Sequence, residues 1–417
     1  MKNRTFSKRP ILFRAINSVW KSTYFLGSKI ILDKDDLISK ARKTTGLTDL
    51  GKDFQDEPVE RMLRSINGEA NLNPIGRFIT RERLSSLISI RLRAEYFFKK
   101  HPEILEQELY PAWIIVGLQR TGTTKLQRLL AVDPNHRVIP SWEVINPLPL
   151  KLDFRPSANY EDPKRIKVAR TSVKAVEWMS PGFFAIHPID AIQPEEDILM
   201  LDVSFLSTTT EAMMNVPSYA AWLETVDQSQ AYEYAVKLLK FLQWVKPAKR
   251  WVLKTPHHLE FPHLITKHFN EVKFLWPHRN IYESVPSYLS MLTYNYMMFS
   301  DDVDERKIAQ HWVRKTGYML QQALDFRLQG NNSEKFLDIY YKDLIRDSMQ
   351  ELGRIYSLDG GLNETLVERF RKHEEEHPHR KHGIHQYSLE DFGLSEADID
   401  KHTSHYQEFM KEHYGRK

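Results

Sequence analysis

The feature that most restricts the fold of this chain is a short apolar run that leads into a glycine-containing loop and then a helix. Residues 112–116 read AWIIV, a continuous apolar stretch that is typical of a buried strand in a parallel sheet. Residues 117–124 form the loop, and a helix is predicted over residues 125–131. A unit of this kind points backbone N–H groups and the positive end of a helix dipole at one spot, which predicts an anion-binding site.

Later apolar runs predict the rest of the sheet. Similar stretches occur at residues 251–253, 272–276 and 336–340, and helix-like sequence separates them. We therefore predict an α/β fold, with a P-loop-type parallel sheet flanked by helices. Residues 106–417 are predicted to form the sheet-containing domain, with a helical insertion at about 150–245, and residues 1–105 a helical N-terminal region.

The side chains of the loop indicate which anion it binds. Thr123 occupies the place where nucleotide-triphosphatase loops carry their phosphate-binding lysine. Arg120 supplies a positive charge from inside the loop instead, and a guanidinium can hold two oxygens of one tetrahedral group. A P-loop kinase or another nucleotide-binding protein stays open as an alternative, although a kinase needs the loop lysine and a magnesium-binding carboxylate.

The sequence RTGTT at residues 120–124 resembles the 5′-phosphosulfate loop of sulfotransferases that use 3′-phosphoadenylyl sulfate (PAPS). The resemblance is closest to the branch that contains bacterial sulfotransferase-family proteins and the tyrosylprotein sulfotransferases. It identifies residues 106–417 as a PAPS-binding domain and implies sulfuryl transfer to a hydroxyl or amine without a metal. It also implies that the loop holds the 5′-phosphate of PAPS through these residues: Arg120, Thr121, Gly122, Thr123 and Thr124.

A second motif matches the contact that this family makes with the 3′-phosphate of the donor. Relatives place an arginine at a strand end and a serine eight positions later, and Arg279 and Ser287 have this spacing. The chemistry agrees, because an arginine makes charge-assisted hydrogen bonds and a serine adds a hydroxyl from the first turns of the next helix. The resemblance therefore implies that these two residues bind the 3′-phosphate.

Sulfuryl transfer needs cations for the leaving phosphate oxygen and a base for the proton of the acceptor. Arg120 and Lys254, which directly follows the apolar run at residues 251–253, are the predicted cations. Glu143, in the sequence SWE, is the predicted base because the family carries a glutamate at the comparable place, and His136 is the runner-up. A catalytically inactive protein that keeps the fold is a further alternative, which the presence of all three charged residues disfavours.

The acceptor is expected to be a small molecule or a lipid-like compound. Tryptophans and phenylalanines are frequent between residues 176 and 251, and the sequence PEED at residues 194–197 resembles an acidic stretch of the same branch. Histidines crowd residues 373–385, but the charged residues around them favour a solvated segment over a metal site.

Composition and charge exclude several other classes. The chain has no cysteine, which excludes disulfides, thiolate metal sites and cysteine nucleophiles. Its 59 basic residues barely outnumber its 55 acidic ones, so no nucleic-acid partner is predicted. No apolar run is long enough to span a membrane, and we expect a cytoplasmic location. Two interpretations stay open for residues 11–32: a helix packed on the protein's own core, which is favoured, or a basic amphipathic helix on an anionic membrane surface.

Overall fold

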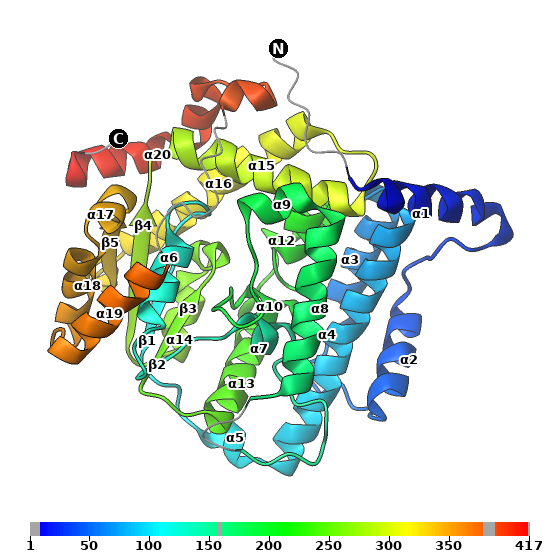
Figure 1. The fold of residues 1–417 in the computed structure, drawn as a ribbon, viewed down its shortest axis with the longest axis horizontal. Coiled ribbons are helices and arrows are strands. Elements are labelled where there is room, and N and C mark those ends of the chain that lie inside the picture. The colour runs from blue at the N-terminus through cyan, green and yellow to red at the C-terminus, as the bar shows by residue number, and fades with distance from the viewer. Residues whose placement is uncertain (1–8, 157–160, 378–387, 416–417) are drawn as a thin grey trace.

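The centre of the molecule is a parallel β-sheet, seen in a computed structural model that describes residues 9–156, 161–377 and 388–415. Its five strands have the order β2-β3-β1-β4-β5, and every neighbouring pair is parallel. The strands are β1 (Ala112–Ile115), β2 (His136–Arg137), β3 (Arg250–Lys254), β4 (Val272–His278) and β5 (Phe336–Tyr340). The predicted α/β class with a parallel sheet flanked by helices is confirmed (Figure 1).

The middle residues of the central strands are apolar because the sheet is covered on both faces. Trp113, Ile115 and Leu275 pack on one face against the helices α6 (Thr123–Leu130), α18 (Ser348–Tyr356) and α19 (Glu364–Glu376). Ile114 and Phe274 point to the other face and join the larger core. Successive strand side chains point to opposite faces, so a run that is buried on both sides shows no polar alternation.

The helices fall into three groups along the chain. The N-terminal region holds α1 (Ile11–Ser22), α2 (Lys34–Thr45), α3 (Asp56–Glu69), α4 (Pro74–Lys100) and α5 (Glu103–Glu106). The segment before β3 holds α7 (Ser141–Ile145), α8 (Pro163–Met179), α9 (Pro181–Ile186), α10 (Ile198–Asp202), α11 (Thr209–Met213), α12 (Pro217–Leu223) and α13 (Ser229–Val245). The remaining helices are α14 (Pro262–His268), α15 (Ile281–Phe299), α16 (Glu305–Arg327), α17 (Tyr341–Arg346) and α20 (Glu396–Tyr414).

The N-terminal helices share the larger apolar core with the helices that follow β4. Asn73 caps α4 by accepting a hydrogen bond from the backbone of Gly76, and its own N–H donates to Phe299 O at the end of α15. A Cβ on Gly76 would lie 2.3 Å from that carbonyl oxygen, so only glycine allows α4 and α15 to approach this closely. Within the described part of the chain, no helix combines the length and the apolar character needed to cross a membrane.

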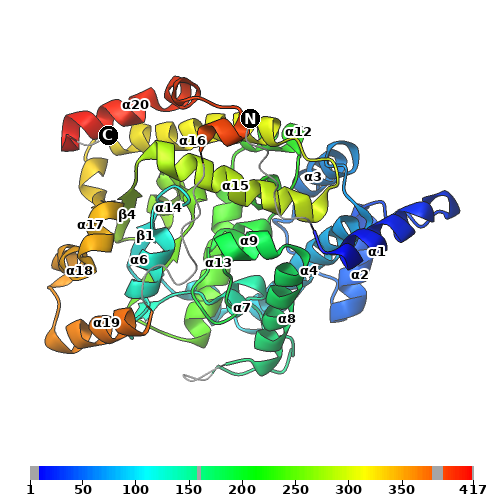
Figure 2. The same ribbon diagram turned by 45° about the horizontal axis from the view of Figure 1, so that its top comes forward.

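Figures 1 and 2 show how these groups surround one edge of the sheet. In both views α9 lies between the sheet and α1, and α15 runs along the same side of the molecule. The chain leaves β1 and β4 at this edge and continues into α6 and α15. Ligands of open α/β sheets bind outside the carboxyl ends of the strands, so this edge is where a site is expected.

Candidate active site

The loop between β1 and α6 is tightly folded around two glycines. A Cβ on Gly117 would lie 2.8 Å from Thr121 Oγ1 and 2.9 Å from Pro277 O, and Thr121 Oγ1 donates to Leu118 O at 2.6 Å. Gly122 has φ +94°, and a Cβ there would lie 2.9 Å from the ring of Tyr341. Both positions therefore need glycine, and the loop forms a compact turn at the end of β1.

The loop ends at the N-terminus of α6, which begins two residues earlier than the predicted helix. Thr123 and Thr124 are its first residues, and no side chain caps the helix at Gly122. The first N–H groups of a helix have no partner within the helix itself, and its dipole favours negative charge there. This terminus has the chemistry of a phosphate site, with two threonine hydroxyls in the first turn.

Three predicted phosphate-binding residues meet at this loop. Arg120 has φ +68°, an uncommon backbone conformation for a side-chain-bearing residue, and its Nε donates to Ser287 Oγ at 3.1 Å. Arg279 Nη1 donates to Arg120 O at 3.0 Å. The structure thus brings Arg120, Arg279 and Ser287 together, although they come from the β1–α6 loop, the end of β4 and α15.

Arg279 is held in place by its neighbours on both sides. Its guanidinium lies over the ring of Tyr341 at 4.5 Å, and its Nε and Nη2 both donate to Glu283 Oε2 at 3.1 Å. The preceding residue, His278, bonds through Nε2 to Asp338 Oδ1 at 2.7 Å and through Nδ1 to Tyr406 OH at 2.8 Å. The backbone at the end of β4 is therefore fixed by β5 and α20.

A cavity of about 690 Å³ opens beside Arg279. It lies among the end of β4, the start of α15, α17 and α20. Arg279, whose guanidinium contacts the loop, is one of the residues that line it. Its lining residues include Arg279, Tyr282, Tyr340, Tyr341, Lys342, Arg346, Tyr406 and Met410. Aromatic rings and cations in one cavity suit a planar, negatively charged ligand.

Lys254 lies at the end of β3, in the strand next to β1. Its side chain is 2% exposed, and Nζ donates to Glu196 Oε1 at 2.8 Å. Its backbone N–H donates to Asp197 Oδ1 at 2.8 Å, and the other oxygen of Asp197 bonds to His258 Nε2 at 2.7 Å. The acidic stretch at residues 194–197 is therefore the direct partner of the lysine, and Asp197 holds the strand end in place.

Glu143 pairs with an arginine of the edge strand β2. Its side chain is 4% exposed, and Oε2 accepts from Arg137 Nη2 at 2.6 Å. The runner-up His136 bonds through Nδ1 to Leu130 O at 2.7 Å and lies against the rings of Trp113 and Tyr356.

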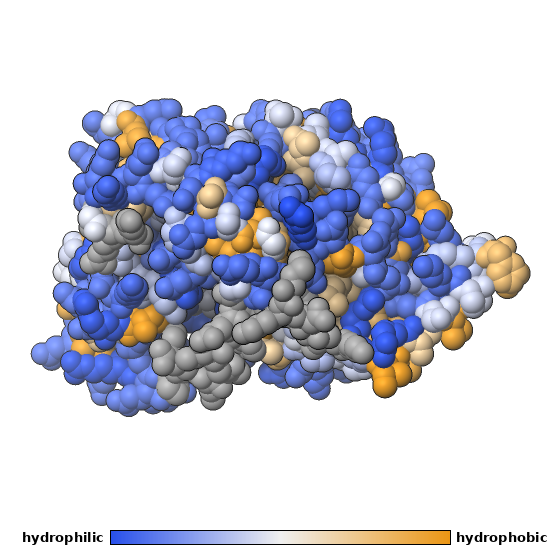
Figure 3. All heavy atoms as spheres, turned by 90° about the horizontal axis from the view of Figure 1, so that it is seen from above, coloured by the Kyte–Doolittle hydropathy of each residue, from blue (hydrophilic) through white to orange (hydrophobic). Residues whose placement is uncertain are grey.

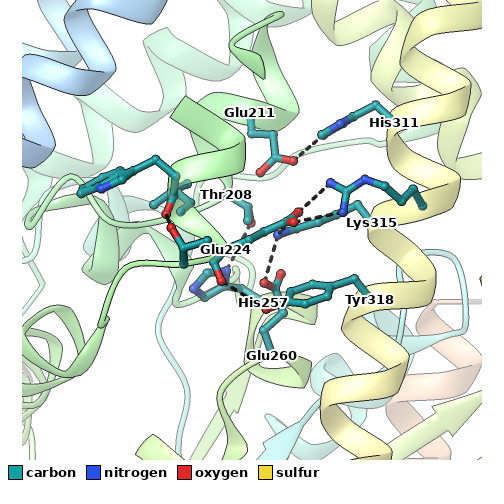
Figure 4. Close-up of polar contacts among 12 residues, drawn as sticks. Thr208, Glu211, Glu224, His257, Glu260, His311, Lys315 and Tyr318 are labelled. Carbon is teal, nitrogen blue, oxygen red and sulfur yellow. Dashed lines mark hydrogen bonds and ion pairs between the residues drawn. The ribbon is translucent and has the colours of Figure 1, made fainter. Parts of the chain in front are cut away.

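A buried polar network lies directly behind the end of β3 (Figure 4). His257 contacts Thr208 and Gln228, and Lys315 Nζ on α16 bonds to Glu260 at 3.0 Å and to Glu224 at 3.3 Å. Burial raises the pKa of Glu260 to about 7, although Lys315 works in the opposite direction. The network ties the turn after Lys254 to α11, α12 and α16.

Sequence reasoning missed one titratable side chain close to this site, His187. It directly follows α9. Burial, and then the charge of Lys254, lowers the pKa of His187 to about 4; Arg120 lowers it further, whereas Glu196 raises it. Its sequence context, FFAIHP, contains no motif that marks it. Only the folding of α9 over the loop brings it to Lys254, so no local signal could have identified it.

The structure describes only part of the histidine-rich segment. His373 and His377 lie one turn apart at the end of α19, whereas His379, His382 and His385 fall outside the described residues. Within residues 9–156, 161–377 and 388–415, no three acidic or histidine side chains are arranged to hold a metal ion.

Comparison with protein families gives a match over most of the sheet-containing part of the chain. The family model described as "Sulfotransferase family" matches residues 111–360. Among characterised proteins, the omega-hydroxy-beta-dihydromenaquinone-9 sulfotransferase Stf3 of Mycobacterium bovis is 26% identical over 308 residues. That match covers 70% of this chain and 73% of the relative, and the protein of the same name from Mycobacterium tuberculosis matches equally well.

Two solved structures share the fold over a longer stretch. Sulfotransferase STF1 from Mycobacterium tuberculosis H37Rv is 26% identical, with a TM-score of 0.77 over 90% of this chain and 99% of that one. Sulfotransferase STF9 from Mycobacterium avium, at 23% identity, has a TM-score of 0.80 over 91% of this chain and 97% of its own and shows the fold alone. The shared fold therefore extends beyond residues 111–360.

Proposed function

The chain belongs to the sulfotransferase family, and on this basis we propose that PAPS is the donor of the sulfuryl group that it transfers. The observation that carries the proposal is the meeting of Arg120, Arg279 and Ser287 at the β1–α6 loop. PAPS carries charge at two separate points, the 5′-phosphosulfate and the 3′-phosphate. Two guanidiniums that share one loop suit such a ligand better than a single phosphate site does.

In this proposal the two ends of the donor are bound by different groups. Residues 120–124 and the N-terminus of α6 hold the 5′-phosphate: Arg120, Thr121, Gly122, Thr123 and Thr124. Arg279 and Ser287 bind the 3′-phosphate, and the cavity beside Arg279 takes the nucleoside. Gly117 and Gly122 have no room for a side chain beside Thr121, Pro277 and Tyr341, which keeps the turn at the end of β1 compact.

Transfer itself needs the bridging oxygen of the phosphosulfate to leave with negative charge. We assign Arg120 and Lys254 to the stabilisation of that charge, since positioned cations in a dry site lower such barriers strongly. Lys254 is buried and its direct anionic partner is Glu196. A donor bound at the loop would therefore compete with Glu196 for the ammonium group.

The sequence predicts Glu143 as the base that takes the proton of the acceptor. Its carboxylate is buried and bound to Arg137, so this role requires the ion pair to open. If Glu143 is the base, the Glu143→Gln variant abolishes turnover and leaves nucleotide binding unchanged. Rates like those of the wild type in that variant would remove the assignment.

We also propose that the acceptor is a lipid-like alcohol. The relative Stf3 is named for its action on a hydroxylated dihydromenaquinone, a long apolar molecule with a terminal hydroxyl. Helix α9 meets the loop at its end, where the carbonyl of Ile186 accepts from Arg120 Nη1 at 3.3 Å. The segment beside the loop is apolar, since Phe183 and Ile186 are both buried.

Donor and acceptor are tested separately. Calorimetric titration should give tight binding of adenosine 3′,5′-bisphosphate and weak binding of ATP–Mg²⁺, and the reverse order would favour a kinase-type protein. Incubation with radiolabelled PAPS and a panel of lipids, sugars, phenols and peptides should then label a lipid alcohol first. Absence of label on every acceptor, with intact bisphosphate binding, would overturn the proposed activity but not the donor site.

A membrane surface is the partner that we propose for the N-terminal segment. Helix α1 rests on the protein through Phe13 and Asn17, which are buried. Large apolar side chains that are between 38% and 83% exposed cover its other side and the turn that follows: Ile11, Leu12, Ile16, Val19, Phe25, Leu26 and Ile31. Figure 3 shows apolar residues where the molecule projects furthest. Contiguous apolar surface on a projecting element marks an interaction site.

The charge of this segment favours anionic lipid as the occupant. Arg14, Lys21 and Lys29 are exposed, and residues 9–32 contain no acidic residue. Apolar side chains that enter the acyl region and cations that meet lipid phosphates are the two parts of interfacial binding. A membrane contact would also place the protein where a lipid alcohol is found.

Vesicle sedimentation tests this contact. The wild type should sediment with phosphatidylglycerol-containing vesicles and weakly with pure phosphatidylcholine. The double variant F25A/L26A should lose about tenfold or more in binding, because two exposed apolar side chains no longer enter the bilayer. A matched variant, L328A/L358A, removes two exposed leucines elsewhere and should bind like the wild type. Equal binding by both variants would contradict the proposal.

A further inference from the structure

His187 occupies a fixed position beside the loop. Its backbone N–H donates to Phe183 O at 2.8 Å and closes α9, and its ring lies edge-on to the ring of Phe183 at 5.6 Å. The carbonyl of the preceding Ile186 accepts from Arg120 Nη1 at 3.3 Å. The arginine of the loop thus holds the end of α9, and with it His187, at the site.

His187 differs from the other histidines around the sheet edge in what its ring contacts. The rings of His257, His258 and His278 are buried and hydrogen-bonded on both nitrogens. His187 is partly exposed, and among the described residues its ring nitrogens have no hydrogen-bond or ion-pair partner. Three histidines are therefore structural, whereas the fourth presents an unused nitrogen.

The charges that face His187 come from four elements. Lys254 lies at the end of β3, Glu196 precedes α10, Arg120 is in the loop and Arg128 is in α6. Burial and the three cations keep the imidazole neutral at pH 7, since they lower its pKa to about 4 and Glu196 only partly offsets them. A neutral imidazole has one nitrogen that accepts a hydrogen bond.

We propose that His187 accepts the proton of the acceptor hydroxyl during sulfuryl transfer. The acceptor oxygen forms the new bond to sulfur, and the bond from sulfur to the bridging oxygen breaks. The electron pair of that bond stays on the 5′-phosphate of adenosine 3′,5′-bisphosphate, and the acceptor proton moves to a ring nitrogen of His187. This inference rests on the proposed PAPS-dependent activity and names the acceptor-side group of the same site.

Two physical arguments favour His187 over Glu143 for this step. Taking Glu143 from Arg137 would leave a buried guanidinium without its carboxylate, which is costly, whereas His187 has no bond to break. The donor also prepares the histidine, because its phosphate and sulfate charges lie against Arg120 and Lys254 and offset the cations that depress the pKa. The pKa of His187 should therefore rise when the donor binds, which strengthens it as a base.

The kinetic experiment compares His187→Gln with Glu143→Gln and a matched histidine control, His263→Gln on α14. The acceptors are octan-1-ol, a weak acid, and 4-nitrophenol, a much stronger one. His187→Gln should reduce kcat/KM for the alcohol by about 100-fold or more and for the phenol far less, because an acidic acceptor needs little help from a base. His263→Gln should leave both rates unchanged, and Glu143→Gln should lower the two rates by the same factor.

A second measurement decides the question without any acceptor. NMR titration of isotopically labelled histidines should show the pKa of His187 near 4 in the free protein and higher with adenosine 3′,5′-bisphosphate bound. Bisphosphate affinity should be unchanged in His187→Gln. A His187 resonance that ignores the bisphosphate, or an alcohol rate unchanged in His187→Gln, would overturn this inference alone. A wild type that binds no bisphosphate would instead overturn the proposed donor.

Discussion

The donor side and the acceptor side of this site are assembled in different ways. On the donor side, Lys254 is the last residue of β3, and the loop at residues 117–124 and Arg279 come just after the ends of β1 and β4. The parallel register places Ile115 beside both Lys254 and Leu275, so these strand ends must meet. On the acceptor side, His187 and Glu196 lie in connections between short helices. Their positions depend on contacts between segments that are distant in the sequence.

This difference shows which functional residues can be located in space from one sequence alone. A residue one step beyond a buried strand can be located in space as soon as the strand is recognised. A residue in a helical insertion cannot, because its position follows from packing that no local pattern encodes. Variants on the donor side should therefore change binding and rate with little loss of stability, whereas the supports of the acceptor side should affect stability as well.

The largest effect is expected from Lys254→Met, which removes a donor-side cation and keeps most of its apolar stem. Loss of a charge stabiliser in a buried site should cost about 3 kcal/mol of barrier, or roughly a 100-fold fall in kcat. Lys273→Met is the matched control, since Lys273 lies on β4, on the other side of β1 from β3, and donates to Glu334 O away from the site. Turnover with radiolabelled PAPS measures both variants. A kcat for Lys254→Met within threefold of the control would place the leaving-group charge elsewhere.

A stability effect is expected next, from Glu260→Gln in the network behind β3. Burial raises the pKa of Glu260 to about 7 in the folded protein, whereas the unfolded chain has the ordinary value of 4.5. Between these two pH values the unfolded chain gives up a proton that the folded protein keeps, so stability falls as the pH rises through this window. At about 1.4 kcal/mol per pKa unit, the contribution is on the order of 3 kcal/mol.

Urea unfolding at pH 5 and pH 8 measures this contribution. The wild type should lose stability over that interval, and Glu260→Gln should lose less because its amide does not titrate. Affinity for adenosine 3′,5′-bisphosphate should be the same in both proteins, since the network supports the turn after β3 and not the loop. Equal pH slopes would show that Glu260 is already ionised in the folded protein.

Much of the fold could be predicted from the sequence because the strands are locally encoded. The runs at residues 112–116, 251–253, 272–276 and 336–340 correspond to β1, β3, β4 and β5. The edge strand β2 was not predicted, since its two residues carry no periodicity and pair only with Arg250 and Trp251. The start of α6 was placed two residues late, because threonines are poor evidence for a helix interior and Gly122 alone marks its beginning.

The candidate site was predictable to the same extent. Arg120, Arg279 and Ser287 come together as their spacing from strand ends implies, and their roles in binding the donor remain predictions. The motif at Glu143 predicts a base, but no local pattern shows that Arg137, six residues earlier, pairs with it. The pairing of Glu196 with Lys254 was equally hidden, because it joins positions 58 residues apart.

Arg279→Ala should weaken the binding of adenosine 3′,5′-bisphosphate by about tenfold, the size of a charge-assisted hydrogen bond. The loss should be specific to the 3′-phosphate, so adenosine 5′-monophosphate should bind the variant and the wild type alike. Calorimetry with both nucleotides gives the discrimination directly. An equal loss for the two nucleotides would mean that Arg279 acts by holding the loop at Arg120 O and not through the 3′-phosphate.

The smallest effect should come from Glu283→Gln, which tests whether Arg279 is restrained before the donor arrives. In the free protein Glu283 takes two of the guanidinium's hydrogen bonds, and a phosphate that binds through the same nitrogens must displace it. The pair is half-exposed on the carboxylate side, so it is worth less than about 1 kcal/mol, and its loss should tighten bisphosphate binding only two- to fivefold. The tighter binding of the bisphosphate should disappear in 0.5 M salt, where the screening length for exposed charges falls to roughly 4 Å. Weaker binding in Glu283→Gln would mean that the carboxylate orients Arg279 toward the ligand, and the donor side would then depend on a neighbour in α15 as well as on its strand ends.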